Sequence, residues 1–305
     1  SVQDDYNPNT EQYTLTISQR TPPTAEQQEK LPLHIPFDIE LYDNEGKVIP
    51  LQKEGHPVHN VLNVTQTEQT FVFDNVYFQP VPSLLRDFSA PVKLEYKWSD
   101  QQLTFLMRHA KNDFARWDAA QSLLATHIKL NVARHQQGLA LSLPLHVADA
   151  FRAILLDDQI DPALAAEILT LPSVNEIAEL FDIIDPVAIA AVREALTRTL
   201  ATELADEFLA VYNAHKLDSY RVEHEDIGKR SLRNTCLRYL AFGDAQLADK
   251  LVSQQYHEAD NMTDALAALA AAVAAQLPGR DLLMQEYDDK WHQDGLVMDK
   301  WFILQ

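Results

Sequence analysis

The sequence is poor in several features that mark common classes of protein. It has one cysteine, Cys236, so no disulfide can form within the chain and no cysteine pair can hold a metal ion. Its seven glycines leave little material for phosphate-binding loops, and it contains no P-loop, dinucleotide-binding pattern or Gly-x-Ser-x-Gly motif. No run approaches the roughly 20 apolar residues that span a bilayer. These shortages argue against a disulfide-rich protein, a nucleotide-binding enzyme and a membrane span.

Basic residues are also scarce, with 25 Lys and Arg against 45 Asp and Glu and a formal net charge of −20. Phosphate groups are bound by clustered Lys and Arg, so this balance argues against a nucleic-acid partner and an anionic membrane surface. The segment from Ser1 to Pro8 is polar and acidic and does not resemble a secretion signal. We therefore expect a cytoplasmic location, with Cys236 as a buried structural thiol.

What the chain does contain changes character at Trp98-Ser99. Ten of its fifteen prolines lie in the first 98 residues, among short runs in which apolar and polar side chains alternate. Such runs predict strands with one buried face, and about seven of them predict an immunoglobulin-like β-sandwich over residues 1–98. The clearest candidate strands are 13–17, 37–41, 47–51, 58–64, 70–76 and 92–98.

Residues 99–305 predict an all-α superhelical array of helix pairs. Ser99 and Gln102, and again Ser173 and Glu176, have the spacing of a capping box. Asp161 and Asp185 each precede a proline that suits the first helical position. Gly138, Gly243 and Gly295 are expected at helix ends. Ten helices are predicted, at 100–109, 113–137, 145–157, 162–171, 174–182, 187–215, 226–242, 245–258, 263–277 and 280–293.

The eleven histidines and the acidic clusters suggest no metal site. A zinc-protease helix needs His-Glu-x-x-His, and His257-Glu258 is followed by Asn261 where the second histidine should stand. The acidic cluster at 223–226 is expected to be a solvated loop, with attraction of a divalent cation as the less favoured alternative. His127 and His135 lie two helical turns apart, too far to share a metal ion, and His109 and His146 are expected in loops or at helix ends.

A basic patch is predicted on the helix that carries Cys236. It comprises Arg230, Arg233 and Arg238, with Asn234 beside them. An ion-paired helix face is the favoured interpretation in so acidic a chain, and a polar groove facing a ligand or another domain is the alternative.

Long stretches of the chain resemble the bacterial aminopeptidase N family, a group of zinc metallo-aminopeptidases. The resemblance is carried at the junction by 94–103 and 112–121, earlier by 13–15, 18–23, 33–36 and 88–92, and later by 261–266 and 299–302. It covers the whole chain in order. The family order implies that this chain is the non-catalytic C-terminal part, with a sandwich at 1–98 and a truncated helical cap at 99–305.

The resemblance implies a soluble enzyme that uses zinc to release N-terminal amino acids from peptides. The family's zinc-binding His-Glu-x-x-His, its Gly-x-Met-Glu-Asn motif and its catalytic tyrosine have no counterpart here, so no catalytic, substrate-binding or metal residue is predicted in this chain. The implied partners are the catalytic domain of the same parent chain and the parent's peptide substrates, and the parent is expected to be a monomer. The apolar end at 301–304 also leads us to expect that the chain continues.

The resulting hypothesis is a part of an aminopeptidase that encloses the active site, binds no zinc and is inactive alone. The alternative is a free-standing helical scaffold that binds peptides without enzymatic activity.

Overall fold

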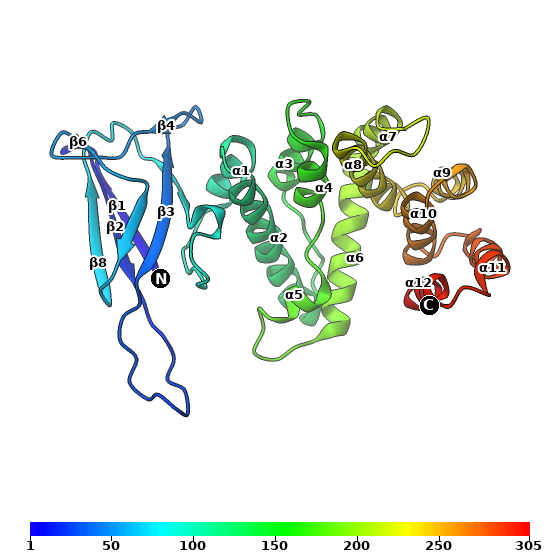
Figure 1. Cartoon of the computed structure of the whole chain (residues 1–305), viewed down its shortest axis with the longest axis horizontal. Coiled ribbons are helices and arrows are strands. Elements are labelled where there is room, and N and C mark those ends of the chain that lie inside the picture. The colour runs from blue at the N-terminus through cyan, green and yellow to red at the C-terminus, as the bar shows by residue number, and fades with distance from the viewer. The chain divides into compact units, whose positions relative to one another are not determined.

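The computed structural model describes residues 1–305 and contains two compact units, Ser1–Leu123 and Leu124–Gln305. The first holds all the strands, and the second holds most of the helices (Figure 1). Helix α2, Asp113–Gln136, runs from one unit into the other.

The first unit is a β-sandwich, which confirms the predicted immunoglobulin-like class. One sheet has the order β1-β2-β8, and in the other β3 pairs with β4, β7 and β9. A further short pair joins β5 and β6. The strands are β1 Val2–Asn7, β2 Gln12–Ser18, β3 Ile35–Tyr42, β4 Val48–Ile49, β5 Gln52–Lys53, β6 His56–Pro57, β7 Val61–Val64, β8 Glu68–Phe73 and β9 Val81–Leu84.

Alternation along the strands builds the core between the two sheets. Tyr13, Leu15 and Ile17 of β2 are buried, while the residues between them are partly exposed. From the facing sheet, Phe37 and Ile39 of β3 join the same apolar cluster. The alternation at 13–17 and 37–41 therefore predicted the buried faces correctly.

Two parts of the predicted sandwich were wrong. Residues 92–98 form no strand, although the Val2 amide donates to the Glu95 carbonyl at 2.9 Å. Instead, the hydroxyls of Tyr96 and Tyr13 both donate to the carboxylate of Asp4, at 2.9 and 3.0 Å. Strands β1 and β9 were missed, because the polar residues of β1 and the proline in β9 hide their pairing partners from a local pattern.

The helices begin where the caps predicted. Both capping boxes form, at Ser99 for α1 and Ser173 for α5, and Asp161 and Asp185 cap α4 and α6. The helices are α1 Asp100–His109, α2 Asp113–Gln136, α3 Leu145–Leu155, α4 Pro162–Ile168, α5 Val174–Ala178, α6 Pro186–Glu203, α7 Ala205–Ala214, α8 His224–Leu240, α9 Ala245–Glu258, α10 Met262–Ala274, α11 Arg280–Trp291 and α12 Gly295–Leu304. A 3-10 turn, η1, covers Arg86–Phe88.

Two helix ends differ from the prediction, and a third matches it. The expected helix 187–215 breaks at Leu204, whose φ of −121° and ψ of 23° end α6 and begin α7. Gly295 starts α12 rather than ending a helix, because Asp294 accepts hydrogen bonds from the amides of Leu296 and Val297. Gly138, by contrast, follows α2 with a φ of +67°, as a helix-ending glycine should.

Helix α8 is the centre of the second unit. It contacts α4, α6, α7, α9 and α10, and most of its residues from Arg230 to Leu240 are buried. The ring of Tyr239 stacks on Phe208 of α7, with centroids 4.5 Å apart, and meets Phe151 of α3 edge-on. Because α8 is largely covered from Arg230 onward, the polar residues of that part are expected to find most of their partners inside the unit.

Candidate functional site

Two arginines of the predicted basic patch of α8 are buried inside the second unit, while Arg238 and Asn234 are half-buried. Arg230 is 6% exposed and Arg233 is 8% exposed. The Arg230 guanidinium lies over the ring of Tyr220, 4.7 Å from its centroid, and that of Arg233 over Tyr212, at 4.4 Å. These are cation–π contacts, which stabilise a charge most strongly where water is excluded.

The hydrogen bonds of these two arginines go to neutral oxygens. Arg230 Nη1 donates to the Arg221 carbonyl at 3.0 Å, and Arg233 Nη2 donates to the Tyr212 hydroxyl at 2.9 Å. The Nε of Arg233 is buried and has no hydrogen-bond partner. Neither guanidinium has a carboxylate within 4.0 Å, so the favoured prediction of an ion-paired helix face was wrong for both.

The acidic residues beside the arginines are held by neutral donors. Asn234 donates to Asp264 Oδ1 at 2.9 Å and accepts from Gln255 at 2.7 Å. Asp260 accepts from the Tyr220 amide at 2.7 Å and from Asn261, and these bonds, with the Asn261 side chain first, lower the pKa of Asp260. The cluster is therefore a polar network in which positive and negative groups do not touch.

A small cavity of about 30 Å³ opens inside this network. It is lined by Arg230 and Arg233 on one side and by Asp260, Asn261 and Asp264 on another, with His215 and Tyr220 also contributing. A water molecule needs about 10–15 Å³ of such space, so the cavity has room for one or two waters and not for an organic substrate. Its geometry suits a hydrated structural network rather than catalysis.

The incomplete zinc-protease motif is divided between two helices. Helix α9 ends at Glu258, and Asn261 is the N-cap of α10. His257 lies between the Ser253 carbonyl and Glu286, each at 2.8 Å, while Glu258 accepts from Lys216 and Gln254. These residues thus have partners of their own and share no helical face with Asn261.

The acidic cluster at 223–226 is solvated as predicted at Glu223, His224 and Glu225, but it forms the start of α8 rather than a loop, and Asp226 is buried. Glu223 is the N-cap of α8, and Asp226 in its first turn is 1% exposed. Asp226 forms a two-point ion pair with Arg221, at 2.6 and 3.1 Å. A carboxylate in the first turn is also favoured by the helix dipole, so this residue is part of how α8 starts.

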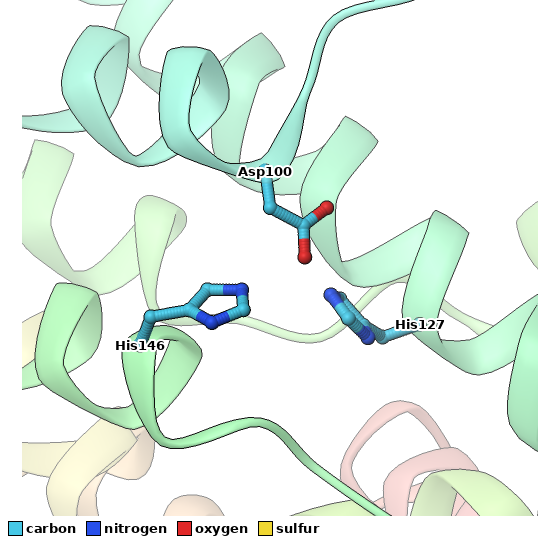
Figure 2. Close-up of side chains that lie close together, drawn as sticks. All are labelled: Asp100, His127 and His146. Atoms are coloured by element: carbon cyan, nitrogen blue, oxygen red, sulfur yellow. The ribbon is translucent and has the colours of Figure 1, made fainter.

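Two histidines that the sequence separates are brought together in the second unit. His127 of α2 and His146 of α3 have ring centroids 6.0 Å apart, with their planes inclined at 63° in an edge-on arrangement (Figure 2). Asp100, also labelled there, belongs to the first unit. Two imidazoles supply half of the four ligands typical of zinc. The absence of metal ligands in this chain therefore stays a prediction.

Cys236, His109 and His146 lie where the sequence predicted them. Cys236 is fully buried, and burial raises the pKa of its thiol to about 12, which makes it unreactive. His109 is the last residue of α1, and His146 is the second of α3. Sequence reasoning missed Arg193, which approaches Arg238 from α6, since nothing in the local pattern links residues 45 positions apart.

An immunoglobulin-like sandwich followed by a helical repeat array defines a two-part class of protein, and family comparison agrees. Residues 1–97 match a family described as a domain of unknown function (DUF3458) with an Ig-like fold. Residues 100–305 match its companion, a domain of unknown function (DUF3458_C) with ARM repeats. The chain belongs to this family.

Its relatives are aminopeptidases. The chain is 84% identical to aminopeptidase N of Escherichia coli and 47% identical to that of Haemophilus influenzae, in each case over 100% of this chain and 35% of the relative. Among solved structures, Legionella pneumophila aminopeptidase A in complex with aspartic acid matches 99% of this chain and 34% of its own, with a TM-score of 0.83 and 28% identity. The resemblance to the aminopeptidase N family is thus confirmed, and the chain spans about a third of the length of these relatives.

None of the helices is both long enough and apolar enough to cross a bilayer.

Proposed function

We propose that the chain is the non-catalytic C-terminal part of a zinc-dependent aminopeptidase N, with a sandwich at 1–98 and a helical cap at 99–305. The observation that supports this most directly is 84% identity over the whole chain to aminopeptidase N of Escherichia coli, of which the chain spans 35%. In this proposal the parent enzyme releases N-terminal amino acids from peptides in the cytoplasm. The cap encloses the active site and controls which peptides reach it.

The zinc of the parent is placed outside this chain. The residues here do not fit a zinc-peptidase centre, because His257, Glu258 and Asn261 are divided between α9 and α10. The pair of His127 and His146 offers imidazoles but has no glutamate of the His-Glu-x-x-His type on the same helix. No catalytic step is therefore assigned to residues of this chain.

A comparison of the 305-residue chain with the longer parent tests the non-catalytic assignment. The purified chain is expected to leave an alanine anilide substrate uncleaved and to carry far less than one zinc per chain by elemental analysis. The parent, assayed in parallel, is expected to cleave it. Hydrolysis by the chain alone, with one zinc bound, would overturn the proposal. So would a natural reading frame without an upstream His-Glu-x-x-His, which would favour the free-standing scaffold.

The enclosing role needs a separate measurement in the parent. A peptide inhibitor with a photoreactive group at its carboxyl end is expected to label residues within 99–305, because the cap surrounds the entrance in this proposal. The same group on a single-residue inhibitor, which would not extend beyond the catalytic centre, is the control. Labelling by the peptide that falls entirely outside 99–305 would contradict the enclosing role.

A further inference from the structure

A cleft of about 250 Å³ lies between α6 and α8 in the second unit. Much of its surface is apolar, supplied by Leu171, Val174, Ala190, Phe242 and Ala274. The helices around it contact one another, since α6 packs against both α5 and α8 (Figure 1). The space is about eight times that of the cavity beside Arg230 and is large enough for a single amino-acid-sized group.

Two arginines, Arg193 and Arg238, are among the residues that line this cleft. Arg193 donates from Nε to the Pro172 carbonyl at 2.7 Å and from Nη2 to the Leu171 carbonyl at 3.3 Å. Arg238 donates from Nη2 to the Thr170 hydroxyl at 2.9 Å. A guanidinium has five N–H groups, so each arginine keeps donors that these bonds do not use.

The two positive charges have no carboxylate partner. Neither Arg193 nor Arg238 forms an ion pair within 4.0 Å. Burial and the charge of Arg238 lower the pKa of Arg193, which reflects the cost of holding two like charges close together in a partly dry place. A bound anion would offset that cost.

The nearest acidic side chains are engaged elsewhere. Glu194 lines the cleft but pairs with Arg198, one turn further along α6, at 2.9 Å. Glu176 accepts from the Ser173 amide at 2.7 Å in the capping box of α5, and those bonds to Ser173 lower its pKa. The charge of Glu176 acts on Arg193 from a distance, but neither guanidinium has a carboxylate within 4.0 Å.

We propose that this cleft binds the carboxylate of a small apolar acid, held by Arg193 and Arg238 with its apolar part against Leu171, Val174 and Phe242. Arginine recognises carboxylates through paired N–H donors, and an apolar surround strengthens that contact. The chemistry is shared by a free apolar amino acid and by the C-terminal residue of a peptide. The inference rests on the cleft alone and does not depend on the aminopeptidase role proposed above.

Calorimetric titration of the 305-residue chain with N-acetyl-leucine tests the proposal. Saturable binding is expected, and the neutral N-acetyl-leucine amide is expected to bind at least tenfold more weakly because it lacks the carboxylate. Free leucine distinguishes the two sources: tighter binding of N-acetyl-leucine favours a peptide C-terminus, and tighter binding of leucine favours a free amino acid. Inorganic phosphate, which lacks an apolar part, is expected to bind more weakly than N-acetyl-leucine.

Substitutions of Arg193 and Arg238 test whether N-acetyl-leucine binds in this cleft. Arg238→Gln and Arg193→Gln are each expected to weaken N-acetyl-leucine binding at least tenfold, with Arg238→Lys intermediate. Arg280→Gln, which removes an arginine paired only with the exposed Asp281, is the matched control and should bind as the unaltered chain does. Thermal unfolding of each variant shows whether it has folded. If Arg193→Gln does not fold, Arg238→Gln, which loses only one hydrogen bond, still tests the proposal.

Three results would overturn the proposal. The first is no binding of N-acetyl-leucine at millimolar concentration. The second is equal binding of the acid and its amide, or tighter binding of phosphate. The third is undiminished binding by folded Arg238→Gln and Arg193→Gln variants.

Discussion

Replacement of Arg86 by methionine is expected to destabilise the sandwich strongly. Arg86 Nη1 lies 3.3 Å from Glu40 Oε1 and 3.8 Å from Asp38 Oδ1. Glu40 is only 8% exposed, and its other oxygen accepts a hydrogen bond from the Tyr42 hydroxyl. The guanidinium is held there by a tight turn in which Leu85 and Asp87 have φ values of 56° and 52°. Arg86 is thus the cation that compensates a buried carboxylate.

The expected loss in the free energy of unfolding depends on the carboxylate that Arg86→Met leaves uncompensated. Removing one partner of a fully buried ion pair costs about 3–5 kcal/mol, because the other charge is left without compensation. Here the Arg86 and Glu40 side chains are 18% and 11% exposed, and Glu40 keeps its bond from Tyr42. We therefore expect Arg86→Met to lower the free energy of unfolding by about 2–4 kcal/mol. Arg280→Met, at the exposed pair with Asp281, should cost less than about 1 kcal/mol.

Urea unfolding followed by fluorescence measures both costs. Hydrogen exchange of peptides covering 35–42 assigns the loss to the sandwich, because a chain of two compact units need not unfold in one step. Adding Glu40→Gln to Arg86→Met removes the uncompensated charge and should recover a substantial part of the stability. Equal costs for Arg86→Met and Arg280→Met, or no recovery in the double variant, would refute the reasoning.

Three other perturbations test separate features. Burial raises the pKa of Asp38 above its ordinary 3.8, so the native state binds that proton more tightly and the free energy of unfolding should fall as pH rises through the window above 3.8. Asp38→Asn should flatten that fall in urea titrations at several pH values, and an unchanged slope would contradict it. Gly46→Ala should cost about 1 kcal/mol more than Gly55→Ala in thermal unfolding, because both have positive φ but only at Gly46 does the added Cβ meet the His109 ring, at 2.7 Å. Cys236 should react with a disulfide reagent about a hundredfold more slowly in the native chain than in urea, and rapid native labelling would show that it is not buried.

The helix starts could be predicted because their signals are local. The hydrogen bonds of the capping boxes at Ser99 and Ser173 join residues three positions apart, so the sequence spacing alone specifies them. The break at Leu204 has no such signal. Leucine is a good helix former, and the residues on either side continue the apolar stripe, so only packing in the folded unit can interrupt the helix there.

In the sandwich, too, local patterns could be predicted from the sequence and long-range contacts could not. Alternation identified β2 and β3, whose buried faces are apolar. It failed for β1, because Asp4 and Asp5 make that strand look like a solvated segment. The Asp4 carboxylate is in fact the acceptor for Tyr13 and Tyr96, and the second of these lies 92 positions away. A partner at that distance cannot be read from a local pattern.

The arginines of α8 show why the site could be foreseen only in part. Their clustering on one helix was visible in the sequence, but their partners were not, since Arg233 bonds Tyr212 at 21 positions away and Arg238 bonds Thr170 at 68. The favoured prediction was an ion-paired helix face, because the chain has 45 acidic residues against 25 basic ones. The same excess of acidic residues makes it informative that these arginines have no carboxylate partner. In a chain with so many available carboxylates, four arginines of the second unit, Arg193, Arg230, Arg233 and Arg238, are held by carbonyls, hydroxyls and rings. Two of them surround a cavity that admits only water, and the other two face a cleft of about 250 Å³. The difference in size, with charge the same, is the physical reason to look for a ligand at the second place and not at the first.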